Sequence, residues 1–170
     1  MVRSRLHIVL ALAVAALLGG CFGPPTLADR IRDQHVSPDA VVRLSDDQAI
    51  AAKRDGSRVV VLNFSNTLRG WQTQEIASDT VGKEPSSLTL FTLGGQTNLE
   101  WNTFVYGTAP AQVSRVKLAG LDYEGGQVAD GAWVIALRVR DVMPQDLHWE
   151  FVGATGGVVQ SGDGIFPPKA

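Results

Sequence analysis

The residues of this chain that could act as nucleophiles or bases are few and scattered. Two histidines, His35 and His148, lie beyond the apolar N-terminal stretch, and Cys21 is the only cysteine. Nucleophilic catalysis would need one of these imidazoles beside a hydroxyl or thiol that it activates. The sequence has no Gly-x-Ser-x-Gly turn that would place a serine on a nucleophile elbow. His148 alternates with Glu150 on one side of an expected strand, which predicts a solvated side chain.

Metal and phosphate chemistry is equally unsupported by the spacing of residues. Two distant histidines and one cysteine cannot build a structural zinc site. The pair Asp46-Asp47 lacks the regular oxygen spacing of a calcium loop. The pairs Gly94-Gly95 and Gly125-Gly126 are isolated and indicate turns, not a phosphate-binding loop. We therefore predict no catalytic residue, no metal site and no cofactor.

The elements that would position any site begin after an N-terminal export signal. Arg3 and Arg5 give a positive start, residues 6–18 are almost uninterruptedly apolar, and small residues follow. This order is typical of a secretory signal peptide, which we place at residues 1–20. The apolar run is shorter than the roughly 20 residues that a membrane-spanning helix needs.

The sequence Leu18-Gly19-Gly20-Cys21 resembles the lipobox of bacterial lipoproteins. The resemblance implies cleavage before Cys21 and acylation of its thiol, for example with palmitate, on the extracytoplasmic side of the cell membrane or the outer membrane. Phe22-Gly23-Pro24-Pro25 cannot continue a helix, because proline lacks the backbone donor. We expect residues 21–44 to be the lipidated cysteine and a tether to the folded body.

Composition limits the class of the mature protein. Of the 15 basic residues Arg3 and Arg5 lie in the signal, which contains no acid, so 13 basic residues face 17 acidic ones and the net charge is −4. The charges are dispersed and form no basic stripe, which argues against a nucleic-acid partner. About 150 residues suit one domain, which we place at residues 45–170.

One helix is predicted at the start of this domain, over residues 45–55. Ser45 and Gln48 have the spacing of a capping box, and Asp46 and Asp47 would lie in the first turn. Gly56 would end the helix in a left-handed conformation.

The remainder of the chain has the pattern of short strands separated by turns. Asp130-Gly131 is a strong two-residue hairpin signal. Short strands at this spacing predict an antiparallel β-sandwich. The expected strands are residues 58–65, 71–77, 87–93, 101–106, 114–118, 132–140, 147–152 and 158–160.

Residues 87–165 also resemble the small immunoglobulin-like modules of bacterial envelope proteins. The resemblance is carried by the segments 105–109, 115–118 and 130–133, which are strands and turns and not a functional motif. The cysteine pair of antibody domains is missing. The expected fold is thus mainly β, an immunoglobulin-like antiparallel β-sandwich with one short N-terminal helix.

Aromatic residues are the remaining candidates for a binding site. Trp133 and Trp149 share faces with other apolar residues, and we predict both in the core. Trp71 follows Arg69-Gly70 at a junction between loop and strand, and Trp101 opens a strand. With Arg69 and Tyr106 they are the candidate partner-binding residues, since exposed aromatic side chains often carry recognition.

These observations favour a non-catalytic binding or structural module of the cell envelope, anchored to the membrane by its N-terminal lipid. Its partner would be an envelope protein or a polysaccharide. One alternative is an enzyme or enzyme accessory that acts on envelope polymers. Another is an inhibitor or assembly factor that presents a loop such as residues 78–87.

Overall fold

A computed structural model describes residues 23–80, 87–92, 103–138 and 144–164 of the chain. In these residues the strands form antiparallel sheets, and one short α-helix precedes them, so the mainly β prediction is confirmed. The elements in chain order are α2 (Leu27–Asp33), η1 (Pro38–Ala40), β1 (Val41–Ser45), β2 (Gln48–Asp55), β3 (Arg58–Thr67), β4 (Gly70–Thr80), β5 (Ser87–Thr92), β6 (Thr103–Thr108), β7 (Val113–Ala119), β8 (Tyr123–Gly125), β9 (Ala132–Leu137), η2 (Pro144–Asp146), β10 (His148–Gly153) and β11 (Val158–Asp163).

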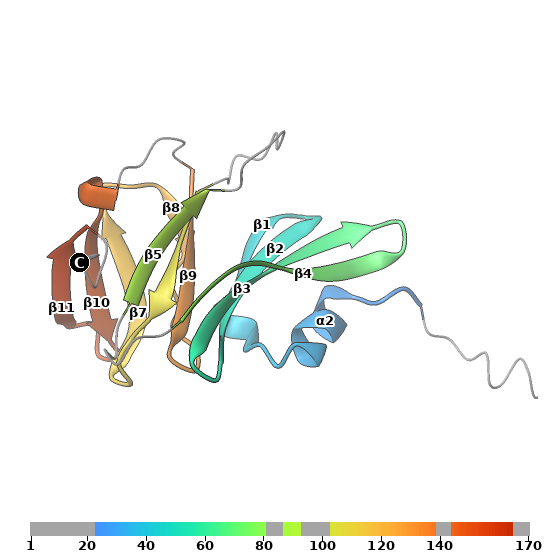
Figure 1. Cartoon of the computed structure of the whole chain (residues 1–170), viewed down its shortest axis with the longest axis horizontal. Helices are drawn as coiled ribbons and strands as arrows, with labels where there is room; N and C mark the ends of the chain where they lie inside the picture. The colour runs from blue at the N-terminus through green and yellow to red at the C-terminus, as the bar shows by residue number, and fades with distance from the viewer. Residues whose placement is uncertain (1–22, 81–86, 93–102, 139–143, 165–170) are drawn as a thin grey trace, which may run out of the picture.

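The strands belong to three sheets. The first sheet has the order β1-β2-β3-β4, the central sheet β5-β6-β9-β8 and the third sheet β11-β10-β7. Figure 1 shows the third sheet on the left, the central sheet in the middle, and the first sheet on the right with α2 beneath it. The resemblance to immunoglobulin-like modules rests on the spacing of strands and turns alone. The immunoglobulin-like topology therefore stays a prediction.

Two apolar cores hold the three sheets together, one on each face of the central sheet. Val105, Trp133 and Ile135 of the central sheet pack against the inward faces of β7 and β10. Phe104 and Val134 point the other way and pack against the first sheet. Every residue of β6 and of β9 is consequently buried. A strand covered on both faces needs apolar residues at successive positions, which explains the continuous apolar sequence of β9.

The helix predicted over residues 45–55 is wrong, because the structure has strands β1 and β2 there. Ser45 pairs with Gln48 across a tight turn, and β2 pairs with β3 along its whole length. The Ser45 hydroxyl accepts a bond from the Asp47 amide at 3.3 Å, so the expected helix cap stabilises a turn instead. Gly56 does have a positive φ of 60°, but in the turn between β2 and β3.

The physical reason is burial on both faces of β2. Ile50 and Ala52 pack toward the central sheet, whereas Ala49 and Ala51 pack toward the N-terminal segment. Helix propensities differ by less than about 1 kcal/mol per residue. Pairing along the eight residues of β2 and burial of Ala49–Ala52 outweigh that preference.

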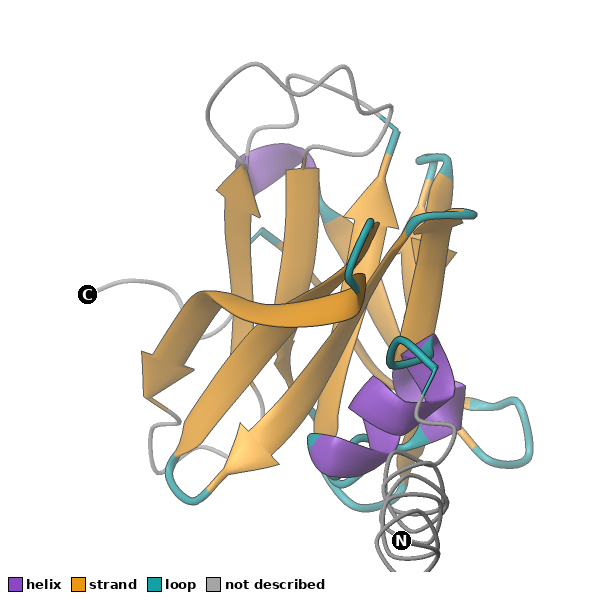
Figure 2. Ribbon diagram, turned by 90° about the vertical axis from the view of Figure 1, so that its right-hand side faces the viewer, coloured by secondary structure: helices purple, strands orange, loops and turns teal. Residues whose placement is uncertain are grey.

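The tether expected over residues 21–44 is also wrong for most of its length. Thr26 caps α2 through a capping box with Asp29, and Leu27 is buried. Val36 and Ala40 are buried against Phe64 and its neighbours on the outer face of the first sheet. Figure 2, viewed from the right-hand side of Figure 1, shows α2 lying against this sheet. The folded body therefore begins near residue 24 and not at residue 45.

Most of the later strand predictions are confirmed within a few residues. Val116 and Leu118 are buried while Arg115 and Lys117 are exposed, as their alternation predicts. Asp130 and Gly131 both have positive φ in the turn that leads into β9, as a two-residue hairpin signal requires. The short strand β8 was not predicted.

Candidate functional site

The acylation site predicted at Cys21 lies outside the described residues. The described chain begins at Gly23, and the next two residues are held against the body. The Trp71 amide donates to the Pro25 carbonyl at 2.9 Å. A Cβ added to Gly70 would lie 2.8 Å from Cβ of Pro24, so only glycine permits this close approach. The N-terminal end of the described chain is therefore fixed beside the β3–β4 turn.

The β3–β4 turn lies at one end of the first sheet and contains the predicted candidate Arg69. Leu68 and Arg69 connect Thr67 to Gly70, and both side chains are exposed. The Thr67 hydroxyl donates to the Gly70 carbonyl at 2.9 Å and accepts from the Arg69 amide at 3.2 Å. Gly70 has a φ of 87°, a conformation that L side chains rarely adopt. These local bonds give the turn a defined shape.

Trp71 covers the edge of an apolar core and does not form an exposed aromatic surface. It is half-buried and packs against the apolar cluster between α2 and the first sheet. Both of its backbone polar groups are used, because the Arg30 Nε donates to the Trp71 carbonyl at 2.7 Å. Trp71 thus connects the helix, the proline pair and the hairpin.

The other two candidates do not join this site. Tyr106 is only 3% exposed, between the first and central sheets, so it offers no surface to a partner. Burial, with a smaller contribution from the Asp79 carboxylate, raises the pKa of Tyr106. Trp101 lies outside the described residues. Of the four candidates, the structure brings together only Arg69 and Trp71.

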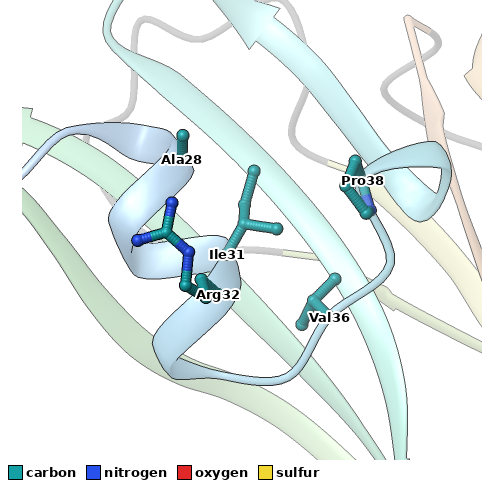
Figure 3. Close-up of a pocket in the computed structure, with 5 residues that line it drawn as sticks. All are labelled: Ala28, Ile31, Arg32, Val36 and Pro38. Atoms are coloured by element: carbon teal, nitrogen blue, oxygen red, sulfur yellow. The ribbon is translucent and has the colours of Figure 1, made fainter.

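A shallow hollow beside α2 was not predicted from the sequence. It has a volume of about 360 Å³ and lies between the helix and the segment that leads to η1 (Figure 3). Ala28, Ile31 and Arg32 of α2 line it, together with Val36 and Pro38. The helix beside the hollow could have been predicted from Thr26-Leu27-Ala28-Asp29, which has the spacing of a capping box. An apolar hollow with one cation beside it can receive an apolar side chain of a partner.

His148 has a partner that its sequence neighbours did not reveal. Its Nδ1 lies 2.8 Å from Oδ1 of Asp163 on the paired strand β11. The pair lies on the outer face of the third sheet, where the side chains are 46% and 79% exposed. A carboxylate in this position orients an imidazole. In the part of the chain that the structure describes, no third group is bonded to the other ring nitrogen.

The described residues provide neither a metal-binding cluster nor a membrane-spanning helix. No three histidine, cysteine or acidic side chains among them gather closely enough to hold a metal ion. None of the helices formed by these residues is long and apolar enough to cross a membrane.

Comparison of the chain with family models, curated proteins and solved structures gives no significant match in any of the three.

Proposed function

We propose that this protein is a lipoprotein of the extracytoplasmic membrane surface that works as a non-catalytic binding or structural module of the envelope. The observation that carries the proposal is Leu18-Gly19-Gly20-Cys21 directly after a short apolar run. Such a segment is a secretory signal, and a cysteine at its end is the residue that lipoproteins acylate. Several acyl chains anchor a protein stably, whereas one gives marginal binding.

The start of the folded body supports this arrangement. Pro24 and Pro25 are held against Gly70 and Trp71, only three or four residues after Cys21. An anchor at Cys21 would thus hold the first sheet near the lipid. The third sheet, at the other end of the molecule in Figure 1, would face away from the membrane.

The binding role is supported by the hollow beside α2. Its lining side chains come from elements that pack on the outer face of the first sheet, so they are held in place. Apolar hollows on rigid supports suit the capture of a partner's apolar side chain. Because the hollow is apolar, we favour an envelope protein over a polysaccharide as the partner.

Lipidation is tested with Cys21→Ser in the full chain expressed in bacteria. Wild-type protein should incorporate labelled palmitate, enter the detergent phase and accumulate as precursor when lipoprotein signal peptidase is inhibited. The variant should stay an uncleaved precursor or leave the membrane. Processed variant protein that still enters the detergent phase would contradict the proposal.

The non-catalytic role is tested by complementation of a strain that lacks the protein. Ala28→Gln fills the hollow without adding charge and should weaken complementation while the melting temperature stays unchanged. His148→Ala, which removes the imidazole of the exposed His148–Asp163 pair, should complement fully. Loss of complementation by His148→Ala, with an unchanged melting curve, would favour the enzyme instead.

A further inference from the structure

Leu68 is the most exposed large apolar residue among those that the structure describes. Its relative exposure is 107%, against 55% for Val158 and 45% for Val159. A single exposed leucine on a globular surface needs no special explanation. The position of Leu68, at the tip of the hairpin that also contacts the N-terminal prolines, is what distinguishes it.

The hairpin tip is fixed next to the point where the chain leaves toward Cys21. Gly70 is in close contact with Pro24 and Pro25, and the Trp71 amide is bonded to the Pro25 carbonyl. Three residues of chain span at most roughly 11 Å, so Cys21 cannot lie farther than that from Pro24. Figure 1 shows the β3–β4 turn and the start of the described chain at the same end of the molecule.

The charges at this end limit how the tip could meet a bilayer. Arg69 is exposed beside Leu68, and residues 67–71 contain no acid. The neighbouring β1–β2 turn carries Asp46 and Asp47, and the Asp47 side chain accepts a bond from Asn66 at the base of the hairpin tip. These carboxylates would oppose a broad approach to anionic lipid, but they do not lie within the tip.

We propose that residues 67–70 form a second, non-covalent membrane contact, in which Leu68 enters the bilayer interface and Arg69 binds lipid phosphate. This inference rests on the proposed lipidation of Cys21. Apolar side chains with adjacent cations favour the interface between headgroups and acyl chains. One leucine and one arginine bind a bilayer weakly, so the anchor must first hold the tip at high local concentration. The contact would then fix the orientation of the body on the membrane.

The experiment uses Leu68→Cys in the full chain, processed in bacteria and reconstituted into vesicles of phosphatidylethanolamine and phosphatidylglycerol. Lipidation occupies the Cys21 thiol, so the new cysteine is the only one free to react with a fluorophore that senses polarity. We expect a blue shift of its emission on reconstitution, and loss of fluorescence when spin-labelled lipid is included. Leu68 is fully exposed, so the substitution should not disturb folding.

Val158→Cys is the matched control, because Val158 is also an exposed apolar residue but lies on β11 in the third sheet. Its label should keep the emission of a water-exposed dye. Equal, water-like emission from both labels in anchored protein would overturn the inference. Failure of the lipidation proposal would appear separately, as wild-type protein that reacts with the thiol reagent and washes off the vesicles.

The role of Arg69 is tested by adding Arg69→Gln to the labelled Leu68→Cys protein. The blue shift should decrease in vesicles that contain phosphatidylglycerol, because the cation that pairs with lipid phosphate is lost. An unchanged blue shift in those vesicles would overturn the assignment of lipid phosphate to Arg69.

Discussion

Tyr106 lies between the first and central sheets, where burial of its phenol group links the stability of the fold to pH. Burial, and then Asp79, raise its pKa above the ordinary value of 10.0. Above that pH the unfolded chain releases the phenolic proton first, so stability falls until the folded pKa is passed. Tyr106→Phe should lose less stability than wild type when denaturant unfolding is repeated above pH 10. Equal losses of stability in the two proteins would contradict a raised pKa of Tyr106 in the folded state.

Trp149 is buried in the core between the central and third sheets. Its ring centroid lies 4.9 Å from that of Phe151, and its Nε1 donates to the Gly164 carbonyl at 3.0 Å. Truncation of a buried tryptophan costs about 3–5 kcal/mol. We expect Trp149→Ala to lower the free energy of unfolding by that amount. Trp71→Ala, at a half-buried position, should cost less. The reverse order in denaturant unfolding would show that Trp71 contributes more to stability than Trp149.

At the scale of elements, α2 depends on its capping box. The Thr26 amide and hydroxyl both donate to Asp29 Oδ2, at 2.9 and 2.7 Å. These two bonds, the side-chain one first, lower the pKa of Asp29 below 3.8. The contribution of the carboxylate is therefore complete above pH 3.8 and is lost as the pH falls through the lowered value.

Thr26→Ala should lower stability by about 1 kcal/mol, as loss of a helix cap does. It should also speed hydrogen exchange of the α2 amides, and it should reduce the loss of stability below pH 3.8. The exchange rates of β10 amides are the internal control, because β10 lies in the third sheet. Unchanged exchange in α2 would show that packing of Leu27 alone is sufficient to hold the helix.

At the scale of the molecule, the central sheet belongs to both inter-sheet cores. Val105 and Phe104 are neighbours on β6 and point into different cores. Loss of one core exposes a face of the strands that support the other, so we expect one cooperative unfolding transition. Calorimetry should give a single peak that coincides with the loss of tryptophan fluorescence. Trp149→Ala and Ile50→Ala, in different cores, should each shift this whole peak, and two separated peaks would contradict the shared sheet.

The sequence by itself determined the strand-rich class and the inward faces of the later strands. These features depend on local patterns: alternation as in β7, and turn residues such as Asp130-Gly131. Trp133 and Trp149 were predicted in the core, and both are buried. For Trp149 alternation is sufficient, because β7 and β10 each have one face toward solvent and one toward the core.

The tertiary structure alone decided the state of residues 24–55 and the layering of the sheets. Residues 48–55 carry local helix signals, and they form a strand because partners distant in the sequence cover both of their faces. The same holds for the site: Leu68 and Pro24 are 44 positions apart in the sequence, and the close packing of Gly70 brings their segments together. The His148–Asp163 pair likewise depends on the register between β10 and β11, which no single strand specifies.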